Sequence, residues 1–422
     1  MISESTEATE AYVWVWLPGE TQPVVAGRLA PEGRNLLFNY GRSYLARADA
    51  IPLYEPELPL RPGILPLPPG LSMPSALRDA VPDAWGRRVI LNRLSGTNAA
   101  EPGELTYLLQ SGSDRIGALD FQASPSIFVP RATAAASIEQ LMDAARLVED
   151  GVPLPPDLDA ALLHGSSIGG ARPKALIDAG DEKYIAKFSS STDITSVVKA
   201  EFIAMRLAAL AGIDAAKVRL VHVSGKDVLL IRRFDRIRGE AGWQRRAMVS
   251  ALTLLGLDEM MARYASYQEL ATVVRHRFTD PKPTLRELFA RIVFNILSGN
   301  TDDHARNHAA FWDGHALSLT PAYDICPQGR AGREATQAML IDGDRRLSQL
   351  SLCLDAAPNF LISRDEATAI AARQIATIRR EWQSVCDEAA LGAVDRDLFW
   401  RRQFLNPFAF EGAPEALREM AG

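Results

Sequence analysis

A change of hydrophobic pattern near residue 240 constrains the fold of this chain more than any other feature. Before that point, short runs of apolar residues recur between glycines and prolines, for example YVWVWL from Tyr12, KYIAKFSS from Lys183 and KDVLLIRRFDR from Lys226. Such runs predict β-strands. Beyond residue 240 the pattern becomes mostly helical. We therefore predict an α+β fold, in which a small sheet-rich lobe that ends near residue 235 is followed by a larger helical lobe at residues 236–422.

Proline-rich and linker-like stretches in the sequence predict how the chain divides into segments. The N-terminal strands are followed by a proline-rich stretch (residues 51–70) that cannot be helical. We then expect a helix over residues 76–94, a second around residues 103–112, and a closing strand in IGALDFQA. The segment SPSIFVPRATAAAS has the composition of a linker. We predict a first domain at residues 1–125, a second at 126–235 and a helical third at 236–422.

Composition excludes several classes of function. The net charge of −6 argues against direct nucleic-acid binding as the main activity, since such proteins carry a basic face. The three cysteines lie far apart without a CxxC motif, which argues against a disulfide framework or structural zinc. The acidic N-terminus does not resemble a signal peptide, and no apolar run is long enough to span a membrane. We expect a cytoplasmic protein that binds no membrane.

A glycine-rich turn, SSIGGARPKALI, is the first candidate for binding chemistry. Adjacent Gly169 and Gly170, expected between two strands, allow backbone N–H groups to approach a phosphate closely. The motif is not a P-loop, because Lys174 is not followed by Ser or Thr. The alternative is a plain turn.

Two charged residues follow the glycine turn at informative positions. Lys187 lies in a predicted strand, and Glu201 lies in the next predicted helix. A strand lysine held by a helix glutamate can place its ammonium against nucleotide phosphates. Next, the apolar run Val228–Ile231 ends abruptly in charge, as expected of a strand that leads into an adenine-binding hinge. Two solvated side chains and a plain core strand are the alternatives.

The stretch NILSGNTDDHARNHAAFWDG concentrates acids, amides and histidines. Asp302 is followed five residues later by Asn307, and Asp324 lies in the next strand-like segment, LSLTPAYDI. Phosphoryl transfer requires a carboxylate that accepts the proton of the attacking hydroxyl, and oxygen ligands for Mg²⁺. Asp302 fits the first role, while Asn307 and Asp324 supply hard oxygen ligands.

Two alternatives compete for this stretch. His304 and His308 have the i, i+4 spacing of a metallohydrolase, but Ala305 stands where an HExxH motif has glutamate. A polar helix cap by Asp302 or Asp303 would explain either aspartate alone. It would not explain Asn307 and Asp324 together.

Taken in order, these motifs resemble one family over nearly the whole chain: the HipA-like serine/threonine kinases, which are toxins of bacterial toxin–antitoxin modules. YVWVWLPGE with VVAGRLA and FNYGRSYL resembles its N-terminal subdomain, and DAVPDAWGRRVI resembles a helix of that subdomain. SSIGGARPKALI, YIAKF, RRFDR, GNTDDHARNHAAF and LTPAYDI resemble its glycine-rich, lysine, hinge, catalytic and metal-binding segments. The resemblance implies a two-lobed, protein-kinase-like fold related to the phosphoinositide kinases, with a β-rich N-terminal subdomain and a helical C-terminal lobe.

The resemblance also implies roles for individual residues. Asp302 would be the catalytic base, with Asn307 and Asp324 as Mg²⁺ ligands. The ATP-binding residues would be Ser167, Gly169, Gly170, Lys187 with its partner Glu201, Arg232 and Phe234 through their backbone, and His304. Ser167 matches a serine whose autophosphorylation inactivates the family by ejecting the loop, and Ser166 is a second candidate. Asp303 and His308 depart from the residues found in some members, which have glycine and an apolar residue there.

We therefore expect an ATP- and Mg²⁺-dependent serine/threonine protein kinase that acts as a toxin. By resemblance, its protein substrate would be an aminoacyl-tRNA synthetase or another translation component. A HipB-like antitoxin would supply any DNA binding. The alternatives are a non-catalytic ATP-binding corepressor that acts through an antitoxin complex, and a kinase for a lipid or small metabolite on the same fold.

Overall fold

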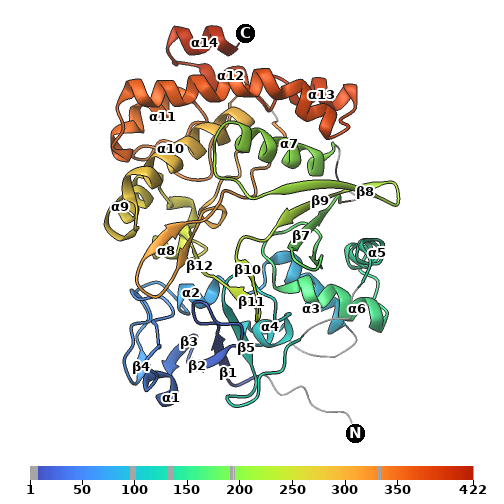
Figure 1. Cartoon of the computed structure of the whole chain (residues 1–422), viewed down its shortest axis with the longest axis vertical. Helices are drawn as coiled ribbons and strands as arrows, with labels where there is room; N and C mark the ends of the chain where they lie inside the picture. The colour runs from blue at the N-terminus through green and yellow to red at the C-terminus, as the bar shows by residue number, and fades with distance from the viewer. Residues whose placement is uncertain are drawn as a thin grey trace. The chain divides into compact units, whose positions relative to one another are not determined.

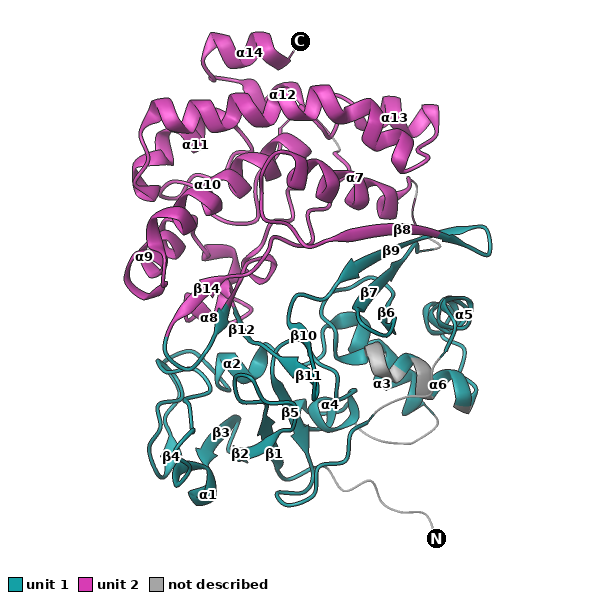
Figure 2. Ribbon diagram, viewed as in Figure 1, with its two compact units in different colours: residues 1–191, 222–249, 311–315 teal, residues 192–221, 250–310, 316–422 magenta. Residues whose placement is uncertain are grey.

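The computed structural model describes residues 8–95, 101–131, 136–190, 193, 195–330, 332 and 334–421. The chain forms two compact units (Figures 1 and 2). Unit 1 contains residues 1–191, 222–249 and 311–315, and unit 2 contains residues 192–221, 250–310 and 316–422. Within the described residues, no helix is both long and apolar enough to cross a bilayer. The three domains predicted from the sequence are a different division, and they stay a prediction.

Unit 1 begins with an antiparallel sheet of five strands in the order β4-β3-β2-β1-β5. The strands are β1 (Ala11–Val15), β2 (Val24–Glu32), β3 (Asn35–Tyr40), β4 (Ile64–Leu65) and β5 (Leu119–Gln122). Val13, Leu29, Phe38 and Phe121 are fully buried, so alternating apolar side chains build the core of this sheet. Strand β5 returns from distant sequence to pair with β1, placing Asp120 opposite Trp14.

The prediction of one helix over residues 76–94 is wrong, because two helices occupy this stretch. Helix α2 (Ser75–Arg78) ends before Pro82, and α3 (Ala84–Arg93) begins after it with Asp83 as the N-cap residue. Proline lacks an N–H and pushes the preceding residue out of the helical region, so one continuous helix is disfavoured. Helices α1 (Arg42–Leu45) and α4 (Glu104–Gln110) complete this part.

The rest of unit 1 contains the glycine-rich segment. Helix α5 (Ile138–Glu149) starts at a capping box made by Ser137 and Gln140. Helix α6 (Pro156–Leu163) continues into the 3₁₀ helix η1 (His164–Ser167), so the two glycines follow a helix and do not lie between strands as expected. Strands β6 (Lys174–Asp178), β7 (Lys183–Phe188) and β9 (Lys226–Arg232) then pair in that order, all antiparallel. The hairpin β10 (Arg236–Gly239) and β11 (Gly242–Arg245) follows.

Unit 2 is mostly helical. Its long helices are α7 (Val197–Leu210), α9 (Tyr267–Arg277), α10 (Pro281–Ser298) and α12 (Arg364–Glu388). Helix α12 packs along α10, and helix α14 (Glu415–Ala421) lies against α12 (Figure 1). The shorter elements are α8 (Ala251–Leu254), η2 (Ala262–Tyr264), η3 (Ala305–Asn307), β14 (Leu317–Leu319), α11 (Leu350–Ala356), η4 (Ala357–Phe360), α13 (Ala393–Phe399), η5 (Pro407–Phe410) and α14 (Glu415–Ala421). Strands β8 (Val218–Val223), β12 (Ala247–Ser250) and β13 (Ala309–Trp312) contain residues of both units.

Candidate active site

The candidate catalytic loop follows directly after the C-terminal end of α10, where glycine and asparagine contacts fix the backbone. Helix α10 ends at Gly299, whose φ of 74° lies in the left-handed region, and a Cβ there would lie 2.7 Å from the backbone oxygen of Gln403. Only glycine combines this conformation with this close approach. Asn300 then donates its backbone N–H to Asn295 O at 2.9 Å and its side-chain N–H to Asn295 Oδ1 at 3.1 Å. The loop that follows therefore starts from a fixed point.

The two adjacent aspartates of the loop have different surroundings. Asp302 is exposed, whereas Asp303 is buried and contacts Tyr267 and His308 through its carboxylate. A base that takes a proton from a substrate must be reachable by that substrate. Of the pair, Asp302 is therefore the candidate catalytic base, as the sequence predicts.

The five-residue spacing of Asp302 and Asn307 is closed by a compact turn. Asn307 Nδ2 donates to the backbone oxygen of Asp302 at 3.0 Å, which leaves the amide oxygen as the atom suited to a cation. The backbone N–H of His304 donates to Asp302 O at 2.9 Å, and that of Asn307 to His304 O at 2.8 Å. His304 and His308 both have extended backbones, so their i, i+4 spacing does not place them on one face of a helix.

Asp324 lies on a segment that is bonded to this turn. The Tyr323 hydroxyl donates to the backbone oxygen of Arg306 at 2.7 Å, one residue before Asn307. Asp324 itself has a φ of 58°, an uncommon conformation for a residue other than glycine that aspartate tolerates. The residues present fit Mg²⁺, since a carboxylate and an amide oxygen are hard ligands from neighbouring segments.

In unit 1, the glycine-rich segment is held against the start of α3. The Asp83 carboxylate accepts the backbone N–H of Gly170 at 2.7 Å, and Gly170 O accepts the backbone N–H of Trp85 at 3.2 Å. The Trp85 indole donates to Lys174 O at 3.0 Å, and Lys174 Nζ donates to Gly169 O. Gly170 has a φ of 104°, so the turn requires glycine there.

Both candidate serines for autophosphorylation are buried in η1. Ser166 accepts the backbone N–H of Gly112 at 3.2 Å through Oγ. Ser167 is 5% exposed, and its Oγ has no hydrogen-bond partner among the described residues. A phosphate cannot be transferred to either hydroxyl unless this segment moves outward.

The remaining predicted ATP-binding residues are distributed over both units. In unit 1, Lys187 is half-buried on β7 opposite Lys174, the Arg232 side chain pairs with Glu182 at 3.1 Å, and the Phe234 ring packs edge-on against Phe311. In unit 2, Glu201 is buried on α7. The pairing of Lys187 with Glu201 stays a prediction.

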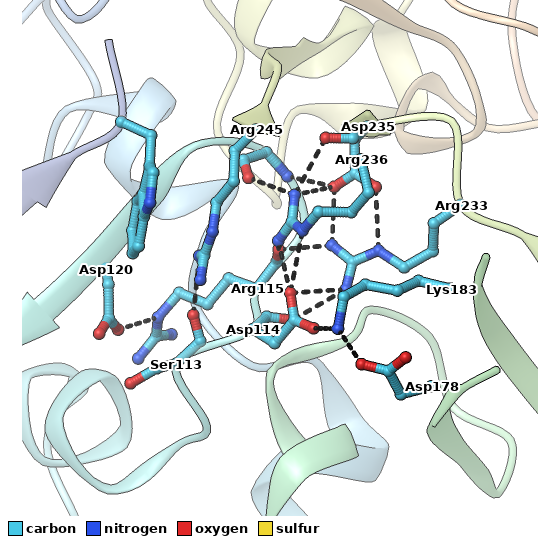
Figure 3. A network of polar contacts seen from close by, with 12 residues as sticks. Ser113, Asp114, Arg115, Asp120, Asp178, Lys183, Arg233, Asp235, Arg236 and Arg245 are labelled. Atoms are coloured by element: carbon cyan, nitrogen blue, oxygen red, sulfur yellow. Dashed lines mark hydrogen bonds and ion pairs between the residues drawn. The ribbon is translucent and has the colours of Figure 1, made fainter. Parts of the chain in front are cut away.

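The segment with Arg232 and Phe234 is fixed by a buried ionic network (Figure 3). Asp114 Oδ1 accepts from Arg233 at 3.0 Å and from Arg236 at 2.7 Å, and Asp235 bonds to both arginines as well. All four residues are buried. Charges this deeply buried are tolerated only when they are paired and hydrogen-bonded. The network ties the loop before β5 to the end of β9.

The positions of the arginines in this network determine the pKa values of its two carboxyl groups. Burial alone would raise the pKa of the Asp114 carboxyl, but Arg233 and Arg236 outweigh burial and hold that pKa well below its usual range. The same balance, dominated by Arg233 among the charges, lowers the pKa of Asp235. Both carboxylates are therefore charged wherever the protein is folded near neutral pH.

The sequence did not predict the contacts of several residues in these sites. Asp83 belongs to a motif that was assigned to a helix, and nothing local shows that its carboxylate binds a glycine 87 positions away. Tyr267 has no motif at all. The RRFDR motif pointed to a hinge, but not to its buried partner Asp114.

Comparison with known proteins finds two family models on this chain. The HipA N-terminal domain matches residues 15–122, and the HipA-like C-terminal domain matches residues 166–383. The Serine/threonine-protein kinase toxin HipA of Shewanella oneidensis is 30% identical over 185 residues, which are 38% of this chain and 42% of that protein. The chain thus spans about two fifths of the length of this curated relative.

The solved structures include one that matches nearly the full chain. It is the Shewanella oneidensis toxin–antitoxin complex of HipA, HipB and operator DNA, with a TM-score of 0.69 and 20% sequence identity. The match covers 96% of this chain and 99% of the other. At that identity, the likeness concerns the fold.

Proposed function

The chain belongs to the HipA-like family, with the α+β fold predicted for it, and we propose that it is an ATP- and Mg²⁺-dependent serine/threonine protein kinase. One observation carries this proposal: an exposed Asp302 whose own backbone oxygen is bonded by Asn307, next to a segment that presents Asp324. A carboxylate that orients the attacking hydroxyl and oxygen ligands for Mg²⁺ are the parts that protein kinases use for phosphoryl transfer.

In the proposed reaction, a substrate serine or threonine oxygen attacks the γ-phosphorus, and the bond from that phosphorus to the bridging oxygen of ADP breaks. Asp302 orients the hydroxyl and accepts its proton. Asn307 and Asp324 would hold Mg²⁺, which neutralises charge on the phosphates. Lys187 would bind the phosphates with Glu201 as its partner, because a buried carboxylate requires a cationic or hydrogen-bonding neighbour. Arg232, Phe234 and His304 would complete the nucleotide site.

Membership of the HipA-like family also suggests a biological role for this chain. The chain would act as the cytoplasmic toxin of a toxin–antitoxin module, with a HipB-like DNA-binding antitoxin and a translation component, such as an aminoacyl-tRNA synthetase, as its substrate. Autophosphorylation of Ser167 would switch it off. Ser167 is preferred over Ser166 because the Ser166 hydroxyl already accepts a backbone bond.

Phosphate transfer from radiolabelled ATP by the purified chain tests the proposal. Asp302→Asn should lower the rate roughly 10²- to 10⁴-fold. The thermal midpoint should be unchanged, because Asp302 is exposed. Asp397→Asn, at another exposed aspartate on α13, serves as the control. A wild type that binds ATP and transfers no phosphate would favour the corepressor alternative. Phosphoproteomics after induction of the wild type and of Asp302→Asn would identify the substrate.

A further inference from the structure

Three buried side chains meet behind the candidate catalytic loop. Tyr267, at the first residue of α9, is 0% exposed, and Asp303 and His308 of the loop are 2% and 3% exposed. The Tyr267 hydroxyl donates to Asp303 Oδ2, while His308 Nε2 lies 2.8 Å from Asp303 Oδ1 and 3.0 Å from the Tyr267 oxygen. Each of the three therefore contacts the other two.

The cluster holds the loop at both ends of its functional turn. Asp303 directly follows Asp302, and His308 directly follows Asn307. The His308 backbone oxygen also accepts the N–H of Ala251 at 2.7 Å, which anchors the same end to α8. A shift of α9 relative to the loop would therefore act on the residues next to both Asp302 and Asn307.

Asp303 and His308 are both polar side chains that the loop buries in the same part of unit 2. Either polar group alone would be buried without its partner, which costs free energy. Together with Tyr267 they form a set in which each polar atom that faces the others is bonded. The three side chains therefore form one unit in which each polar group depends on the others.

We propose that Tyr267, Asp303 and His308 are positioning residues that fix the separation between Asp302 and Asn307. The inference rests on the proposed kinase function. The physical reason is that catalytic groups contribute fully only within a narrow range of geometry, and a displacement of about 1 Å can cost about 10²-fold in rate.

Tyr267→Phe tests this inference with the smallest change, because it removes one hydroxyl and keeps the ring. Tyr264→Phe, on the 47% exposed ring of η2 in the same unit, is the matched control. For Tyr267→Phe we expect kcat to fall about 10-fold or more with an ATP KM within about 3-fold of wild type. The control should keep both constants. Unchanged kcat in folded Tyr267→Phe would overturn the proposal.

Hydrogen exchange gives a readout that requires no activity. The backbone N–H groups of His304 and Asn307 are bonded within the loop, so exchange over residues 302–308 reports its rigidity. We expect faster exchange there in Tyr267→Phe and unchanged exchange in α12. Equal exchange in the variant and wild type would contradict the positioning role, whatever the enzyme does. A wild type without kinase activity but with this exchange difference would instead contradict the proposed function alone.

Asp303→Asn keeps the proposal testable if Tyr267→Phe does not fold. It preserves the size of the side chain and one oxygen acceptor, so we expect a smaller loss of kcat than for Asp303→Leu. If Tyr267→Phe does fold, the double variant with Asp303→Asn should lose less kcat than the product of the two single losses, because both changes act through one cluster. Losses that multiply would show independent roles and would contradict a shared cluster.

Discussion

The Asp83 carboxylate accepts the backbone N–H of Gly170 at 2.7 Å and so holds the glycine-rich turn against α3. Asp83 occupies the N-cap position of α3, yet its side chain makes no capping bond to that helix within the described residues. Its carboxylate serves the turn instead. The bond competes with any movement that would release Ser167.

We therefore predict that Asp83→Ala loosens the turn and exposes Ser167. A hydrogen bond to a charged group contributes about 1.5–3 kcal/mol, so the open population should rise about 10-fold or more. Labelling of a Ser167→Cys thiol by a maleimide measures this. The three native cysteines are buried, and burial raises the pKa of the Cys386 thiol to about 11, so background labelling is low.

Asp143→Ala is the control for this experiment, since Asp143 is an exposed aspartate on α5 of the same unit. It should label at the rate of the Ser167→Cys parent. Equal labelling of the Asp83 variant and the parent would show that Asp83 does not restrain the turn.

A second prediction concerns Gly86, which allows α3 and η1 to approach. A Cβ at Gly86 would overlap the backbone oxygen of Ser166. Gly→Ala inside a helix normally stabilises by about 1 kcal/mol. Gly86→Ala should instead lower the thermal midpoint, because η1 must move. An unchanged or raised midpoint in thermal unfolding would show that the contact yields easily.

The arrangement of elements along the chain was largely predictable. Residues 183–188 and 226–231 show the apolar runs of β7 and β9, and residues 197–210 show the helical spacing of α7, because these patterns are local. The interruption at Pro82 was also local and was missed, since the apolar spacing of residues 76–94 continues through it. The α+β, HipA-like fold class is confirmed by the family models and by the match to the HipA structure.

The sequence predicted candidate site residues only where the residues that act together lie close together in the chain. Asp302 and Asn307 are five residues apart, and the structure closes that spacing with one hydrogen bond. Contacts such as Tyr267 with Asp303, or Asp114 with Arg233, join distant segments whose approach is set by packing of the whole unit. Neither partner carries a local signal of the other.

A third prediction separates metal binding from backbone strain at Asp324. Asn tolerates a φ of 58°, whereas alanine there costs about 1–2 kcal/mol. Asp324→Asn should therefore keep the thermal midpoint and weaken ATP binding in the presence of Mg²⁺ more than in EDTA. Asp324→Ala should show both effects. Calorimetric titration with and without Mg²⁺ checks this, and equal losses in both conditions would contradict a ligand role.

The last prediction concerns the buried carboxylate of Asp114, whose pKa Arg233 and Arg236 hold well below its usual range against the opposing effect of burial. Lys183 and Arg245 add to this positive surrounding. Asp114→Asn leaves the arginines under-neutralised, and removing one partner of a buried pair costs about 3–5 kcal/mol. Because of this loss of stability, the midpoint of urea unfolding at pH 7, measured by tryptophan fluorescence, should be lower for Asp114→Asn than for the wild type. Asp178→Asn is the control, because this exposed aspartate also pairs with Lys183 but at the surface, where such pairs contribute little.

The sign of the pH dependence follows from the lowered pKa of Asp114. An unfolded aspartate titrates near pH 3.9, so below that pH the unfolded chain binds a proton that the folded protein resists. The stabilisation is complete above about pH 5 and is lost as the pH falls toward the folded pKa. Wild-type stability should therefore decline with acidification more steeply than that of Asp114→Asn, by about 1.4 kcal/mol per pH unit for the missing proton. Parallel declines in the two proteins would show that Asp114 is not the carboxylate that couples folding to acid.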